Sequence, residues 1–215
     1  MTDKIIDTQY DITKKSRFRK FYESNKISIF SFILILFISF GSFSYYLTIK
    51  ENKKIQLSEN YIKAKIYLEN GKEKEATDLL KSVVFSNDST YSTLSFFIII
   101  NQKLITDNKE ILVLYDHLIE NNNFDEEIKN LLIYKKALFK SKFVDEFELL
   151  SDLKPLLNNN SLWEPHALIL IGDYFVAKKQ KIKAKEFYTQ VLSIKNLENN
   201  LYSYASSQLI LITNE

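Results

Sequence analysis

The longest apolar run in the chain lies near its N-terminus, at residues 27–49. Its 23 residues carry no charge, and as a helix they would extend about 34 Å, which exceeds the bilayer hydrocarbon core of about 30 Å. The flanking residues are of the aromatic and basic types that suit a membrane–water interface. They are Arg17, Arg19, Lys20 and Lys26 before the run, and Tyr45, Tyr46 and Lys50 at its far end. The pattern predicts a transmembrane helix, because a buried helix of a soluble core seldom avoids charge over this length.

The segment before the run is basic, with seven basic and four acidic residues among residues 1–26. An excess of positive charge on this side predicts a cytoplasmic N-terminus, although Lys63 and Lys65 beyond the run reduce the bias. A cleaved signal peptide would need a shorter apolar region and a small-residue cleavage site. We therefore expect a short basic cytoplasmic segment at 1–26, an uncleaved transmembrane helix at 27–49, and a helical domain at 50–215 on the other side of the membrane.

Beyond the run, apolar positions recur at the spacing of amphipathic helices and are interrupted by short polar breaks. The breaks occur at residues 70–71, 86–89, 106–108, 121–123 and 158–160. The helices between them are expected near residues 51–70, 73–86, 91–106, 108–121, 124–140, 144–157, 164–179, 181–195 and 199–213. Only three Gly and two Pro interrupt the pattern, so the domain should be all-helical, with Pro155 bending or ending its helix.

Two segments of this domain repeat one spacing of small and large residues, with intervals of three, nine and four. One segment comprises Gly172, Phe175, Ala184 and Tyr188, and the other comprises Ala64, Tyr67, Ala76 and Leu80. Small residues let two helices approach closely and large residues fill the groove beside them, as in a tetratricopeptide repeat. The fold class predicted is all-α: an N-terminal transmembrane helix, then a solenoid of about four tetratricopeptide-like hairpins with a C-terminal capping helix.

The run at residues 96–100 is apolar almost all round, which indicates a helix buried between repeats. An exposed patch that binds a partner is the alternative. The run is too short to be a second membrane span.

Residues that could carry chemistry are sparse in this sequence. His117 and His166 stand alone, there is no cysteine, and no phosphate-binding loop or nucleophile motif occurs. The carboxylate groups at 125–127 and 145–146 fall where helices should begin, so they are expected to complement helix dipoles. His166 is expected to pack or cap at a helix start. We expect no enzyme activity, no catalytic residues, no cofactor and no metal, and the net charge of +2 does not suggest a nucleic-acid partner.

The arrangement of a basic segment, one span and helical hairpins resembles the ancillary subunit of the bacterial SecYEG translocon, a family with a tetratricopeptide-like domain. Residues 91–94, Tyr-Ser-Thr-Leu, look like the start of that family's second hairpin. Trp163 is followed nine residues later by Gly172, and then by Ala184 and Tyr188 in the segment 184–188. The chain departs from the family where Leu112 and Val113 stand in place of small residues, and where Ile, Leu, Phe and Lys replace its alanines.

The resemblance implies a single-pass protein of the bacterial inner membrane, with its helical domain in the periplasm. It implies translocon subunits and periplasmic chaperones as protein partners during export, and no catalytic residues. A structural scaffold of another envelope assembly, such as the cell-division or a secretion apparatus, is the alternative function. A membrane-tethered enzyme is a third hypothesis, which would require a polar pocket with perturbed ionisable groups.

Overall fold

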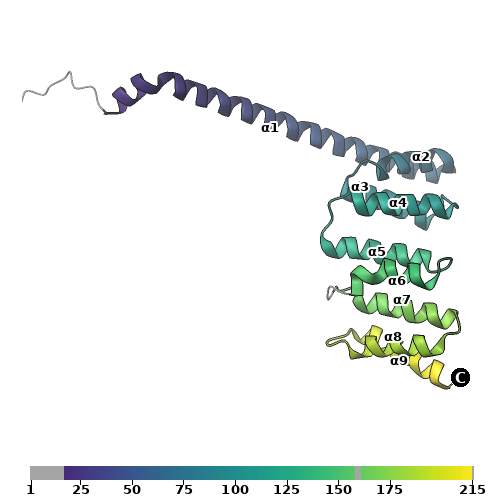
Figure 1. The fold of residues 1–215 in the computed structure, drawn as a ribbon. Helices are drawn as coiled ribbons and strands as arrows, with labels where there is room; N and C mark the ends of the chain where they lie inside the picture. The colour runs from purple at the N-terminus through teal and green to yellow at the C-terminus, as the bar shows by residue number, and fades with distance from the viewer. Residues whose placement is uncertain (1–16, 158–160, 215) are drawn as a thin grey trace, which may run out of the picture. The chain divides into compact units, whose positions relative to one another are not determined.

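The computed structural model describes residues 17–157 and 161–214, with side chains from Phe21 onward. The described residues form nine helices and no strand, which confirms the all-α class (Figure 1). The helices are α1 (Arg17–Glu69), α2 (Glu73–Val84), α3 (Ser89–Asn101), α4 (Asn108–Asn121), α5 (Glu126–Lys140), α6 (Glu146–Leu157), α7 (Glu164–Ala177), α8 (Lys181–Ser193) and α9 (Asn199–Asn214).

Helix α1 joins the expected span and the helix expected at 51–70 into one helix of 53 residues. Its backbone leaves helical geometry at Asn25, close to the start of the apolar run, where the Asn25 side chain donates to the Phe21 carbonyl at 3.2 Å. The chain divides into two compact units within this helix, and the second unit begins at Leu57.

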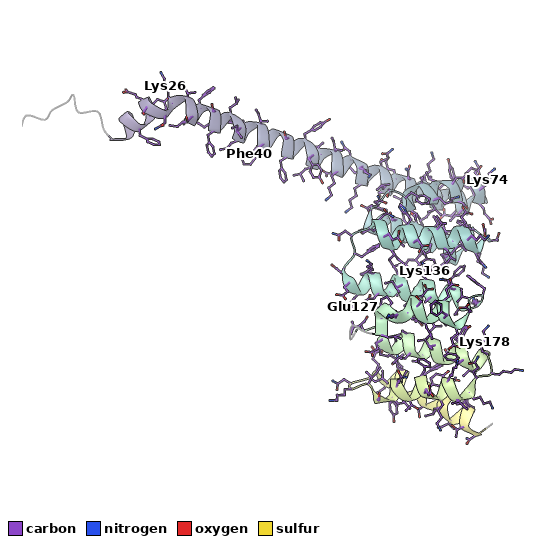
Figure 2. All side chains as sticks on the ribbon, in the orientation of Figure 1. Lys26, Phe40, Lys74, Glu127, Lys136 and Lys178 are labelled. Carbon is purple, nitrogen blue, oxygen red and sulfur yellow. The ribbon has the colours of Figure 1, made fainter. Side chains whose placement is uncertain are left out.

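The first unit holds the apolar run of α1. Among the described residues, α1 is the one helix long and apolar enough to cross a membrane, and none of its most apolar 18-residue window is buried. Figure 2 shows side chains projecting from all sides of the helix around Phe40, which is 70% exposed. Apolar surface of this extent costs free energy in water and is stable in a bilayer, so α1 is a candidate membrane-spanning helix.

The second unit contains two buried apolar clusters on either side of α5. The first cluster joins the end of α1 to α2, α3, α4 and α5, with Ala64, Leu80, Phe96 and Leu132 among its members. The second joins α5 to α6, α7, α8 and α9 and includes Ala137. Helix α5 supplies Leu132 to the first cluster and Ala137 to the second, so it links both halves of the core.

Helices of the second unit contact their neighbours in chain order from α2 to α9. Contacts also join α5 to α7 and α7 to α9, so these three alternate helices lie side by side (Figure 1).

Three helices end in the same backbone motif, in which a residue of positive φ follows the last turn. These residues are Gly71, Lys103 and Lys179, with φ of 72°, 56° and 60°. At α3 the Lys103 and Leu104 amides donate to the Ile100 and Ile99 carbonyls at 3.2 and 3.0 Å. Leu104 then packs against the first cluster. The expected end of this helix near residue 106 is therefore wrong: α3 ends at Asn101, because the chain turns back there and buries Ile105 with part of Leu104.

Pro155 lies inside α6, and the helix ends two residues later at Leu157. The break expected at 158–160 lies outside the described residues. The run at 96–100 belongs to α3 and packs in the first cluster: Phe96 and Ile99 are fully buried and the other three are partly buried. Burial of this run is confirmed.

Candidate functional site

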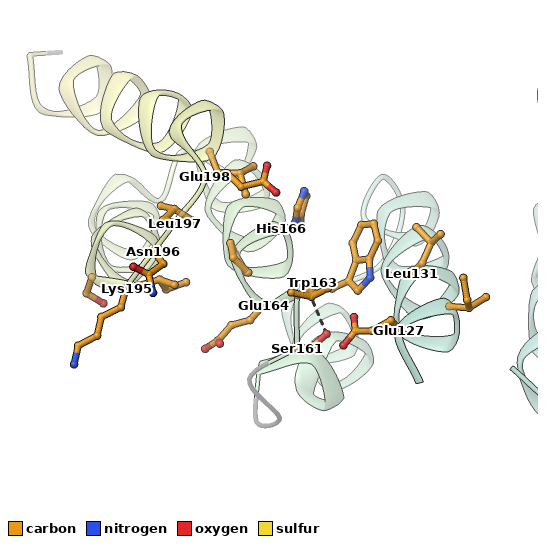
Figure 3. Close-up of a pocket in the computed structure, with 16 residues that line it drawn as sticks. Glu127, Leu131, Ser161, Trp163, Glu164, His166, Lys195, Asn196, Leu197 and Glu198 are labelled. Atoms are coloured by element: carbon orange, nitrogen blue, oxygen red, sulfur yellow. Dashed lines mark hydrogen bonds between the residues drawn. The ribbon is translucent and has the colours of Figure 1, made fainter. Parts of the chain in front are cut away.

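A pocket of about 920 Å³ opens in the second unit, between the N-terminal end of α5, the start of α7 and the connection from α8 to α9 (Figure 3). Its walls are residues 127–128 and Leu131 on α5, residues 161–166, residues 193–198 and Leu201. The volume lies within the range of cavities that hold small ligands or several side chains. The pocket is therefore large enough to admit part of another molecule.

The segment before α7 is held in place by Ser161, which is buried. Its hydroxyl accepts hydrogen bonds from the Asn130 side-chain amide of α5 and from the Trp163 backbone N–H, both at 3.1 Å. Pro165 in the first turn of α7 starts the helix without losing an intrahelical hydrogen bond. These contacts fix the position of Trp163 between α5 and α7.

Aromatic rings form one wall of the pocket. Trp163 stacks on Tyr134 of α5 with centroids 5.5 Å apart and planes at 28°. His166 meets Trp163 at 5.0 Å and Tyr134 at 5.9 Å. The expectation that His166 packs at a helix start is confirmed, since α7 begins at Glu164.

Two polar atoms of the lining residues are buried and have no hydrogen-bond partner among the residues that the structure describes. They are Oε2 of Glu127 and Nδ1 of His166. A buried polar atom without a partner costs about 1–3 kcal/mol. The carboxylates at 125–127 and 145–146 do begin α5 and α6 as expected, but Glu127 also faces this pocket.

A second polar group lies further along α7, seven residues after His166. The carboxylate of Asp173 accepts hydrogen bonds from the Tyr188 hydroxyl at 2.6 Å and from the Tyr204 hydroxyl at 3.1 Å to each oxygen. Burial raises the pKa of Asp173, and the two hydroxyl bonds only partly offset it. Burial and the charge of Asp173 raise the pKa of Tyr204 to about 12, so both hydroxyls remain donors at neutral pH.

The raised pKa of Asp173 has a consequence for stability against pH. Because the folded state holds the proton more tightly than the unfolded state, this group adds stability at low pH, and the contribution is lost as pH rises through the folded pKa. We expect the free energy of unfolding of the wild type to rise relative to that of Asp173→Asn as pH falls from about 7 to about 4. Denaturant unfolding at several pH values measures this difference.

Asp78→Asn on α2 is the control, because Asp78 is an exposed carboxylate. The free energy of unfolding of this variant should depend on pH in the same way as that of the wild type. If the stability of Asp173→Asn changed with pH as much as that of the wild type, Asp173 would be excluded as the source of the pH dependence.

The residues expected to pack the repeats are nearly all buried. Ala64, Ala76, Leu80, Ala184 and Tyr188 are fully buried, and Phe175 is 1% exposed. Gly172 meets the Tyr188 ring so closely that an added Cβ would lie 2.7 Å from Cε1. Tyr67 is only partly buried, and the ammonium groups of Lys63 and Lys72 lie 5.6 and 5.8 Å from its ring centroid.

The expected membrane-flanking residues all belong to α1. Lys26, Tyr45, Tyr46 and Lys50 are exposed, whereas the side chains of Arg17, Arg19 and Lys20 lie outside the described residues. Tyr45 and Tyr46 are 70% and 61% exposed, so both rings are free to lie at a membrane interface.

The pocket was not predicted from the sequence, although three of its residues were considered there. Glu127 was assigned to the helix dipole and His166 to packing or capping at a helix start, and Trp163 was named only as part of the family resemblance. One signal could have pointed to the site: the chain's single tryptophan lies three residues after a polar break. Within the described part of the chain, no group of three or more His, Cys, Asp or Glu could hold a metal ion. The arrangement is suited to non-covalent binding.

The chain was compared with protein-family models, with curated proteins and with solved structures, and none of them matches it.

Proposed function

We propose that this chain is a membrane-anchored protein–protein interaction module, an ancillary subunit of a SecYEG-type translocon that meets periplasmic chaperones during export. The observation that carries the proposal is the exposed apolar run of α1 in a chain whose remaining helices form a separate unit. Such a helix tethers the second unit to the bilayer, where it would meet polypeptides that cross the membrane.

The second unit is proposed to be a solenoid of tetratricopeptide-like hairpins. Contacts between alternate helices α5, α7 and α9 support this, because stacked hairpins bury their apolar faces against the next hairpin. The close approach of Gly172 to Tyr188 supports it as well, since the repeat needs a small residue there. The motif shared by the ends of α1, α3 and α7 gives three of the hairpins a similar turn.

The pocket supports a binding function for this unit. Solenoids of paired helices present an extended face on which side chains of a partner can be seated. Here that face carries a fixed aromatic wall at Trp163 and two buried polar atoms that have no hydrogen-bond partner in the described part of the chain. A cavity of this kind binds side chains without requiring any covalent chemistry.

Site-specific photo-cross-linking in cells tests the proposal. A photoreactive residue at Leu162, which lines the pocket and is 74% exposed, is expected to capture translocon subunits or periplasmic chaperones. The same residue at Ile182, which is 80% exposed and lies outside the pocket, is the matched control. Capture of cell-division or secretion-apparatus proteins at Leu162 would favour a scaffold of another envelope assembly and overturn the translocon assignment.

Topology tests the same proposal independently. A reporter active only outside the cytoplasm, fused after Glu215, is expected to be active, and a reporter active only inside is expected to be silent. The opposite result would place the helical unit in the cytoplasm and contradict the proposal.

A further inference from the structure

The pocket is acidic. Among the described residues that line it are three glutamates, Glu127, Glu164 and Glu198, and a single cation, Lys195, while His166 adds no formal charge when neutral. Figure 3 shows the Lys195 ammonium extending away from Trp163 and His166, whereas Glu127 lies below the Trp163 ring. A partly enclosed site with this balance favours a positively charged occupant.

The side chains of Glu127 and His166 determine which chemical groups can bind in the pocket. Glu127 Oε2 is a carboxylate oxygen and accepts hydrogen bonds only. His166 Nδ1 is also an acceptor when the ring proton is on Nε2. With that tautomer both side chains accept N–H or O–H donors, and a donor that carries positive charge makes the stronger bond to the carboxylate.

The apolar part of the lining is suited to the stem of a long side chain. Leu131, Leu197 and Leu201 are partly buried and line the pocket together with Trp163. Arginine combines an aliphatic stem with a planar cation that has five donors, and its guanidinium packs well on aromatic rings. One arginine side chain could therefore satisfy the carboxylate while it covers apolar surface.

From these features we propose that the pocket binds an arginine side chain of an extended polypeptide, with the guanidinium on Glu127 and the stem against the leucines and Trp163. This inference rests on the proposed function, since it names the kind of segment that the interaction module receives. The volume of about 920 Å³ exceeds that of one arginine side chain, so residues next to the arginine are seated as well.

An anion is the competing occupant, because the N-terminus of α7 faces the pocket and helix N-termini attract negative charge. Glu164 stands in the first turn of α7 and already complements its dipole. Glu127 and Glu198 add further repulsion. The charges therefore favour the cation.

The fluorescence of Trp163 reports occupancy directly, because Trp163 is the only tryptophan of the chain. The full chain in lipid nanodiscs is titrated with a blocked peptide, Ser-Leu-Arg-Leu-Ser, and with versions in which citrulline, norleucine or glutamate replaces the arginine. The arginine peptide is expected to change the Trp163 emission with saturation. The citrulline peptide, which keeps the shape without the charge, is expected to bind at least about tenfold more weakly.

Glu127→Gln is expected to weaken binding of the arginine peptide about tenfold and to leave the citrulline peptide unchanged. Glu126→Gln removes the same charge from the preceding, exposed residue of α5 and should leave both affinities unchanged. Equal binding of the arginine and citrulline peptides by the wild type would overturn the inference without requiring any variant to fold. Tighter binding of the glutamate peptide, or equal binding of free arginine amide, would also overturn it.

These outcomes separate the inference from the proposed function. Capture of translocon or chaperone proteins at Leu162 without any preference for arginine over citrulline would overturn the inference alone. An arginine preference without such capture would leave the binding chemistry supported and contradict the translocon assignment.

Discussion

Replacement of Phe37 and Ile38 by arginine is expected to release the chain from the membrane fraction. Both side chains lie in the middle of the apolar run and are 73% and 60% exposed. Each arginine at the centre of a span costs about 2.5–3.5 kcal/mol on insertion scales, so the pair costs about 5–7 kcal/mol. Cell fractionation followed by alkaline carbonate extraction measures the loss.

The control places the same two charges in α1 but outside the run, as Ile55→Arg with Ile62→Arg. These side chains are 51% and 52% exposed, similar to those in the run. The control should remain resistant to carbonate. If the variant with arginine at Phe37 and Ile38 also stayed in the membrane, α1 would not be the anchor.

Gly172→Leu is expected to destabilise the second unit by about 1–3 kcal/mol through overpacking. A Cβ at this position would lie 2.7 Å from Cε1 and 2.9 Å from Cζ of Tyr188. The ring cannot move away freely, because it is fully buried and its hydroxyl donates to Asp173 at 2.6 Å. The usual gain from replacing a helical glycine, about 1 kcal/mol, is therefore outweighed. Denaturant unfolding followed by circular dichroism measures the change.

Ala177→Leu is the control for this substitution, because Ala177 is exposed at the end of the same helix. It should change the free energy of unfolding by less than about 0.5 kcal/mol. Tyr188→Ala should relieve part of the strain in Gly172→Leu, so the effects of the two substitutions should be non-additive by about 0.5–3 kcal/mol. Strict additivity would mean that the ring and the glycine do not pack against each other.

The pattern of apolar and polar positions was sufficient to predict most of the helices. Polar breaks predict where a helix ends, because the side chains of turn residues form hydrogen bonds with the backbone groups that a helix end exposes. At Gly71 the prediction holds, with a residue that adopts positive φ at little cost. At Lys103 and Lys179 the same conformation occurs in lysine, which local preference disfavours. Packing of the buried Ile105 and the partly buried Leu104 in the first cluster offsets that cost at Lys103.

The pocket illustrates what a linear pattern omits. Glu127, Trp163 and Leu197 are more than 30 residues apart along the chain, yet they line one cavity. In the sequence each has an ordinary explanation: a charge at a helix start, a packed aromatic residue and an apolar helix position. Their common role depends on contacts of α5 with α7 and of α7 with α9, which no periodicity encodes.

The sequence by itself determined the candidate membrane helix and the all-helical class, because both depend on local quantities: the length of an uncharged run and the period of apolar positions. It also indicated the close pair Gly172 and Tyr188 through their spacing. Only the tertiary structure decided that Glu127 Oε2 and His166 Nδ1 are buried in the same pocket lining as Trp163, with no partner among the described residues. Burial and hydrogen-bond satisfaction depend on atoms brought together by packing, so they are properties of the folded unit.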